Sequence, residues 1–125
     1  TQLHPLVRAH KPFGFCDYIA LQKSALCVVS DSGTLAEESS ILGFPAVSLR
    51  TSTERPEVVD CGVFTLGSIE PDGLVQAVAT EIALSGRRAA VLDYADNGTS
   101  VKVVKIIQGF TGYVSHWVWG KGLYR

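Results

Sequence analysis

The sequence has no methionine, few charged residues and no long apolar segment, and each absence excludes something. Its 11 Lys and Arg nearly balance its 12 Asp and Glu, and the basic residues form no cluster. The electrostatic footprint of a nucleic-acid-binding protein is therefore missing. The longest apolar stretches, such as residues 25–29, are too short to span a bilayer, and the N-terminus lacks a secretory signal pattern. We therefore expect no nucleic-acid partner and no membrane partner.

Cysteine is also sparse, and its spacing excludes two kinds of structural site. Cys16, Cys27 and Cys61 are odd in number, lie far apart and form no CxxC pair. Neither a disulfide framework nor a zinc site is indicated, and the three histidines also lack metal-ligand spacing. We therefore predict reduced thiols in a cytoplasmic protein, with no metal and no cofactor.

The missing methionine also bears on where the chain begins. Thr1 cannot be a native initiator, so we expect that the start was processed or trimmed, or that the chain is part of a longer protein. Residues 1–12 show no helical or strand period of their own. The length and the 46% hydrophobic content suit one globular domain over residues 1–125.

Helical and strand patterns alternate along the chain. Helices are predicted at residues 17–25, 34–42, 54–61, 71–84 and from 99 or 100 to about 117–119, with a connector at 86–98. Short, continuously apolar strands are predicted at residues 26–30, 46–49 and 63–66. In the helix at 71–84, one apolar side is expected to consist of Leu74, Val75, Val78, Ala79 and Ile82. The pattern predicts an α/β protein, a partial Rossmann-like parallel sheet in three layers.

The segment after the first strand has the composition of an anion site. Ser32, Gly33 and Thr34 supply two hydroxyls and an unhindered backbone where a helix begins. Helix N-termini favour anions such as phosphate, through their dipole and unpaired amides. Glu38, in the first turns of that helix, could accept hydrogen bonds from a ribose diol. The alternative is that Asp31 or Ser32 merely caps the helix and that its glutamates balance the dipole.

Residues 30–57, SDSGTLAEESSILGFPAVSLRTSTERPE, resemble a known family signature. The sequence is similar to the D-S-G-G-x-x-E-E, L-G-x-P and R-x-x-T-E-R-P-E blocks of UDP-N-acetylglucosamine 2-epimerases. The flanks at residues 11–25 and 93–121 resemble the subgroup that makes UDP-N-acetyl-L-fucosamine for surface polysaccharides. The resemblance implies the C-terminal part of a GT-B fold, in which UDP or a UDP-N-acetylhexosamine binds between two domains.

The resemblance also implies roles for particular residues. Ser32, Gly33 and Thr34 would hold the diphosphate, Glu38 the ribose hydroxyls, and Tyr18 would lie against the uracil. Thr34 departs from the family pattern, because it replaces the second glycine of D-S-G-G.

The second block places charged residues in a loop that lines the cleft in the family. Arg50 and Arg55 become candidates for contact with substrate or for pairing on domain closure, and Glu54 for orienting Arg55. As bare sequence, the same loop is most often a solvated surface with weak ion pairs.

The implied reaction inverts C2 of the sugar by elimination and re-addition of UDP. In the family, the acidic residues that act at C2 belong to the N-terminal domain, and a His near the leaving group lies at the start of the C-terminal domain. We therefore expect no catalytic residue in this chain and no turnover by it alone. Two alternatives stay open: part of a GT-B glycosyltransferase, or a non-catalytic nucleotide-binding module that self-assembles. We expect the partner to be either a missing N-terminal domain or a second copy in a homo-oligomer.

Overall fold

A computed structural model describes residues 3–86 and 90–122, and the chain divides into two compact units, Thr1–Val91 and Leu92–Arg125. The first unit is built on a parallel sheet of three strands in the order β1-β2-β3. These strands are β1 (Val28–Ser30), β2 (Ala46–Leu49) and β3 (Thr65–Gly67). In the register, Val47 of β2 stands opposite Val29 of β1 and Thr65 of β3.

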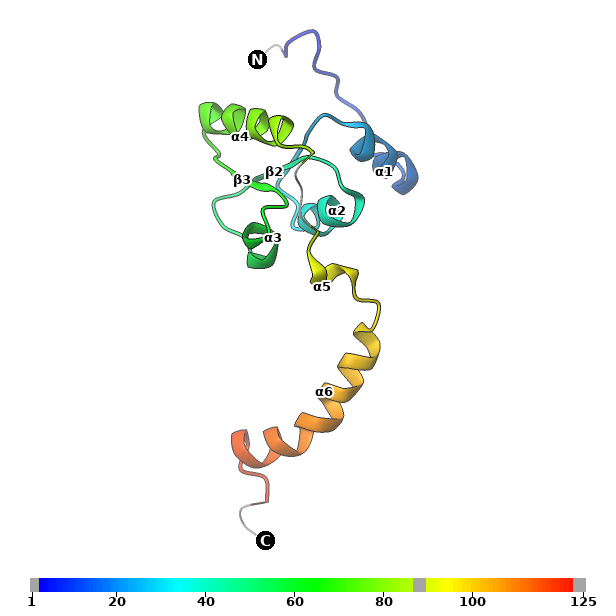
Figure 1. Ribbon diagram of the computed structural model, residues 1–125, viewed down its shortest axis with the longest axis vertical. Coiled ribbons are helices and arrows are strands. Elements are labelled where there is room, and N and C mark those ends of the chain that lie inside the picture. The colour runs from blue at the N-terminus through cyan, green and yellow to red at the C-terminus, as the bar shows by residue number, and fades with distance from the viewer. Residues whose placement is uncertain (1–2, 87–89, 123–125) are drawn as a thin grey trace. The chain divides into compact units, whose positions relative to one another are not determined.

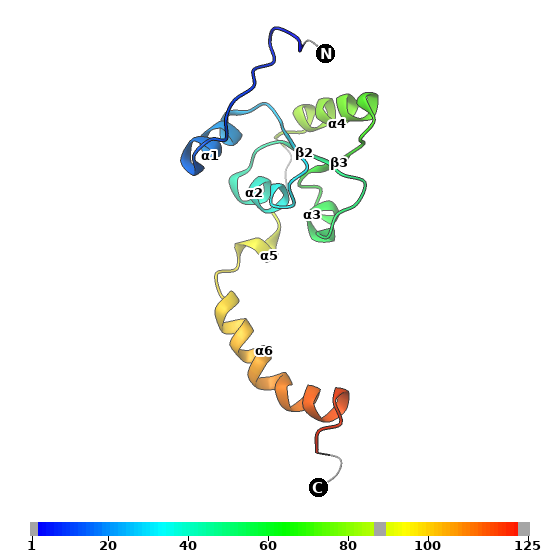
Figure 2. The same ribbon diagram turned by 180° about the vertical axis from the view of Figure 1, so that it is seen from behind.

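Helices cover both faces of this sheet. The described residues of the first unit form the helices α1 (Phe15–Ser24), α2 (Leu35–Leu42), α3 (Pro56–Asp60) and α4 (Pro71–Ala83). In both views α4 lies on one side of the strands and α2 and α3 lie on the other (Figures 1 and 2). The predicted three-layer parallel α/β arrangement is therefore confirmed.

The core lies around β2, the central strand. Ala46 and Val47 are completely buried, and Leu35, Phe44 and Val58 pack around them with almost no exposed surface. Such continuous burial is expected of a strand that is covered by helices on both faces. The core therefore fixes β2 and the start of α2 relative to each other.

The two outer strands differ from the prediction. β1 begins only at Val28, and it is not buried on both faces, because Leu26 is 78% and Val29 39% exposed. β1 forms an edge of the described sheet. β3 begins two residues later than predicted, because the Val63 amide donates to the Val58 carbonyl and closes the turn after α3.

α4 occupies the predicted residues but turns a different side to the sheet. Ala77 and Glu81 are buried, whereas Val75 and Ile82 are exposed. The Thr65 hydroxyl of β3 donates to Glu81 Oε1 at 2.6 Å, so a polar contact fixes the rotation of the helix. The predicted apolar side is therefore wrong in part.

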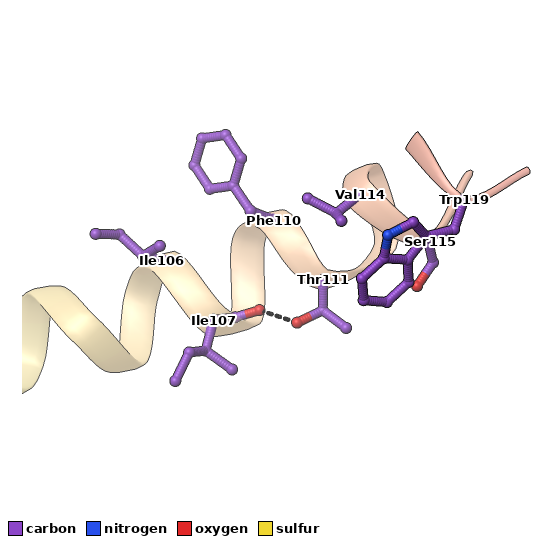
Figure 3. A pocket seen from close by; sticks show the side chains of 7 residues that line it. All are labelled: Ile106, Ile107, Phe110, Thr111, Val114, Ser115 and Trp119. Atoms are coloured by element: carbon purple, nitrogen blue, oxygen red, sulfur yellow. Dashed lines mark hydrogen bonds between the residues drawn. The ribbon is translucent and has the colours of Figure 1, made fainter. Parts of the chain in front are cut away.

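The second unit contains α5 (Leu92–Ala95), α6 (Thr99–Tyr113) and a π-helical turn (Val114–Val118). The long predicted helix is confirmed, and α5 lies within the predicted connector, of which residues 87–89 fall outside the described residues. A shallow hollow of about 230 Å³ lies along α6. Figure 3 shows the side chains that line it: Ile106, Ile107, Phe110, Thr111, Val114, Ser115 and Trp119. None of the helices in the described ranges is both long and apolar enough to cross a membrane.

Candidate functional site

The turn between β1 and α2 presents hydroxyl groups to solvent. The Ser32 amide donates to the Ser30 hydroxyl at 3.0 Å, and the hydroxyls of Ser32 and Thr34 lie 3.0 Å apart. Ser32 and Thr34 are both exposed. The turn follows the carboxyl end of a parallel strand, which is where ligands bind in open α/β sheets.

The start of α2 also has backbone amides without partners. Thr34 is the N-cap residue, and no side chain forms a capping hydrogen bond there. The amides of Gly33 and Thr34 donate to no residue within the described ranges. The capping that we weighed as an alternative is therefore absent from this helix start. Two free amides at the positive end of a helix favour an anion.

Gln22, which the sequence analysis missed, holds Glu38. Its amide nitrogen donates to Glu38 Oε2 at 2.5 Å across the gap between α1 and α2. Gln22 is only 2% exposed, and its own Oε1 is buried without a partner in the described structure. A signal for it does exist in the sequence, because Gln22 interrupts the apolar side of α1 formed by Tyr18, Leu21 and Ala25.

Tyr18 lies on the same helix as Gln22, one turn earlier. Both line a hollow of about 250 Å³, together with Phe13, Leu21, Ala25, Cys27 and Val28. Tyr18 is exposed, at 36%, so its ring is available to a ligand. α1 thus connects the hollow at Tyr18 to Glu38 through Gln22.

Arg55 lies directly beside the β1–α2 turn. Its Nε pairs with Glu37 Oε1 on α2, and the two side chains are only 27% and 33% exposed. A Cβ added to Gly33 would lie 3.0 Å from Arg55 Nη1. The guanidinium therefore stands within reach of an anion at the turn, while Glu37 Oε2 is buried without a partner in the described structure.

Arg50 reaches the same turn from the end of β2. Its Nε donates to the Asp31 carbonyl at 2.6 Å, and its Nη1 lies 3.1 Å from Glu54 Oε2. Glu54 also lies 3.6 Å from Arg55 Nη1, so one carboxylate stands between the two arginines. A hollow of about 420 Å³ opens here, lined by Leu49, Arg50, Thr51, Ser52, Glu54 and Ile69.

The structure therefore gathers most of the predicted site residues at one edge of the sheet. Hydroxyls, free amides and two guanidinium groups can together hold a doubly charged anion such as a diphosphate. Within residues 3–86 and 90–122, His, Cys, Asp and Glu nowhere gather in a group of three that could hold a metal ion.

Comparison with known proteins agrees with the family resemblance of residues 30–57. The family model for UDP-N-acetylglucosamine 2-epimerase matches residues 1–108. A UDP-N-acetylglucosamine 2-epimerase of Methanococcus maripaludis is 33% identical over 104 residues, which is 83% of this chain and 28% of the relative. One of Methanocaldococcus jannaschii is 32% identical over 101 residues, which is 81% of this chain and 27% of the relative.

A solved structure extends the likeness to the fold. The UDP-N-acetylglucosamine 2-epimerase from Rickettsia bellii superposes with a TM-score of 0.73 at 36% identity, over 91% of this chain and 32% of that one. The α/β unit thus corresponds to a part of a GT-B fold, as the sequence predicts. The chain spans less than a third of the length of these relatives.

Proposed function

The chain belongs to the UDP-N-acetylglucosamine 2-epimerase family, and from that membership we propose that it provides the UDP-binding side of the active site. One observation supports this proposal more than any other. The β1–α2 turn combines two free amides, two exposed hydroxyls and the Arg55 guanidinium around Gly33. The ligand that this arrangement fits is a diphosphate.

Each part of the nucleotide has a proposed partner. Ser32, Gly33 and Thr34 bind the diphosphate, Glu38 accepts hydrogen bonds from the ribose hydroxyls, and Tyr18 stacks against the uracil. The Thr34 hydroxyl, which replaces the second glycine of the family pattern, lies 3.0 Å from that of Ser32. It can donate to the same phosphate as Ser32, so the replacement adds a donor.

The arginines are proposed to stabilise UDP as a leaving group. Elimination of UDP from C1 of the sugar places a further negative charge on the diphosphate, and fixed positive groups lower the free energy of that state. Arg55 lies at Gly33, and Arg50 is held to the turn through the Asp31 carbonyl. Glu54 lies between the two guanidinium groups and orients them.

We do not propose a catalytic base in this chain. Proton transfer at C2 needs a positioned acid–base group near the sugar, and Glu37, Glu38 and Glu54 are already engaged by Arg55, Gln22 and Arg50. The chain also spans less than a third of its relatives. We therefore propose that it binds UDP or a UDP-N-acetylhexosamine, and that turnover needs residues from outside its 125.

Titration with UDP by calorimetry tests the proposal. We expect a Kd in the micromolar to millimolar range, which is lost in Ser32→Ala and raised at least several-fold, but still measurable, in Glu38→Ala. Ser85→Ala, which removes an exposed hydroxyl beyond α4, serves as the matched control and should leave the Kd unchanged. No heat of binding at millimolar UDP would overturn the proposal and favour a self-assembling module without nucleotide affinity.

A further inference from the structure

Gln22 is a buried polar side chain whose amide nitrogen has a hydrogen-bond partner and whose amide oxygen has none in the described structure. One end of its amide donates to Glu38 Oε2, while Oε1 at the other end is buried without a donor in the described part of the chain. The residue is 2% exposed and lies between apolar neighbours on α1. An unpaired buried acceptor lowers stability. For packing alone, an apolar side chain of the same length would serve as well or better.

The role of the Gln22 amide must therefore lie in its hydrogen bond to Glu38. A glutamate side chain has several rotatable bonds, and it binds a ligand well only when these are held in one arrangement. The hydrogen bond from Gln22 fixes Oε2. The other oxygen, Oε1, has no partner among the described residues and is not one of the buried unpaired atoms, so it remains open to a ligand.

We infer that Gln22 is a positioning residue that holds the Glu38 carboxylate in place for the ribose hydroxyls. This inference rests on the proposed UDP site and adds a specificity role to it. α1 then contributes to recognition twice, because Tyr18, which we propose to stack on the base, lies one turn before Gln22 on the same side. A ligand that lacks a ribose hydroxyl should lose the benefit of this arrangement.

Selectivity for the ribose, measured with deoxynucleotides, tests the inference. We expect the unaltered chain to bind UDP at least several-fold more tightly than 2′-deoxyUDP or 3′-deoxyUDP, because a missing hydroxyl leaves the carboxylate unpaired. In Gln22→Met, affinity for UDP should fall until this ratio approaches one, whereas affinity for the deoxy ligand should stay the same. The melting temperature should stay equal or rise.

Two further variants separate positioning from a general structural effect. In a Glu38→Ala background, Gln22→Met should cause no further change in the ratio, because it acts only through the carboxylate. Gln76→Met, at an exposed position of α4, is the matched control and should change neither the ratio nor the melting temperature.

The possible failures can be told apart. Three outcomes would overturn the role of Gln22 and leave the proposal of UDP binding intact. The first is an unchanged ratio in Gln22→Met, and the second is an equal loss of affinity for all three ligands in that variant. The third is equal binding of the three ligands by the unaltered chain. Absence of UDP binding in the unaltered chain would overturn the proposed function, and this role with it.

Discussion

Gly33 lies close to the Arg55 guanidinium in the candidate site. An added Cβ would lie 3.0 Å from Arg55 Nη1, the far end of a flexible side chain, so the guanidinium can move aside at little cost to the fold. The same methyl group would take up space beside the guanidinium, where we propose that the diphosphate binds. We predict that Gly33→Ala lowers UDP affinity by about tenfold, or ~1.4 kcal/mol, and leaves the melting temperature nearly unchanged. Calorimetry and thermal melting check this, and an unaltered Kd would contradict it.

Arg55 and Arg50 should differ in what they contribute to stability. Glu37, the partner of Arg55, is partly buried and already has one unpaired oxygen, whereas Glu54, the partner of Arg50, is 70% exposed. Arg55→Ala leaves a desolvated carboxylate, which should lower the free energy of unfolding by about 1–3 kcal/mol. Arg50→Ala should lower it by less than about 1 kcal/mol. Urea denaturation of both variants measures the difference, and equal effects would show that Glu37 is well solvated.

Individual residues show what a sequence can and cannot predict here. Ser32, Gly33 and Thr34 are adjacent in the sequence and form one turn, so their pattern was sufficient to predict that turn. Gln22 and Glu81 each bond to a residue 16 positions away on another element. Hydrophobic periodicity can show that a polar residue such as Gln22 lies on the apolar side of a helix, but it does not identify the residue to which it bonds.

The end of α2 depends on the backbone of Gly43. This residue has φ 74°, in the left-handed region, and its amide donates to the Ser39 carbonyl at 2.9 Å. No atom would obstruct an added Cβ, so the effect of Gly43→Ala is purely conformational and should cost about 1–2 kcal/mol of unfolding free energy. Gly86→Ala, which is also open but has no positive φ, is the control and should change stability by less than about 0.5 kcal/mol. Equal values in urea denaturation would contradict the prediction.

The start of α6 should respond to pH through an exposed ion pair. Lys102 Nζ lies 2.5 Å from Asp96 Oδ2, and this hydrogen bond, with a second one from the Gly98 amide, lowers the pKa of Asp96 below its usual value. The same bond raises the pKa of Lys102. The stabilisation from Asp96 is present above the pKa of an unfolded Asp and is lost as the pH falls through the lowered folded value.

Nuclear magnetic resonance titration of the Asp96 carboxyl carbon measures this shift directly. We expect a pKa below the usual range in the unaltered chain and a return toward it in Lys102→Ala, because the largest cause of the shift is then removed. Lys105→Ala, one turn beyond, is the matched control. If the pKa of Asp96 does not change when Lys102 is replaced, the ion pair does not form in solution.

The ends of helices and strands were predictable only where a glycine or proline stood at the end of an apolar pattern. α2 ends at Leu42, before Gly43, as predicted, whereas α3 begins at Pro56, two residues later than predicted. Val63 and Phe64 are buried and apolar, yet they precede β3, because backbone hydrogen bonding at Val63 goes to α3 instead of a neighbouring strand. Burial alone therefore does not make an apolar segment a strand.

At the scale of the molecule, the alternation of short apolar strands with helices was sufficient to predict a parallel sheet in three layers. Parallel neighbours need a crossover of a dozen or more residues, and each strand here is separated from the next by a helix. β2 is buried as expected of a central strand, and β1 is not, because its position at an edge of the described sheet follows from strand order. Strand order is a property of the assembled sheet and could not be predicted from the segments singly.

The division of the chain into two units predicts which residues are sufficient for the proposed UDP binding. All residues that we propose to contact UDP lie between Tyr18 and Arg55, within the unit Thr1–Val91. We predict that a chain ended after Ala95 folds and binds UDP with a Kd within about twofold of the full value, since no proposed contact is lost. Calorimetry with circular dichroism checks both properties. Loss of binding in a chain that still folds would show that residues beyond Ala95 contribute to the site.

A shorter version should behave differently. Val91 is 2% exposed and its amide donates to the Ser40 hydroxyl on α2 at 3.3 Å. A chain ended after Ala83 lacks this contact and uncovers the core beside α2, so its free energy of unfolding should fall by about 2 kcal/mol or more. Because α2 begins at the β1–α2 turn, where we propose that UDP binds, UDP should raise the melting temperature of both versions if the shorter one folds. Equal stability of the two versions would mean that Val91 does not close the core, and the boundary of the nucleotide-binding unit would then lie nearer to α4.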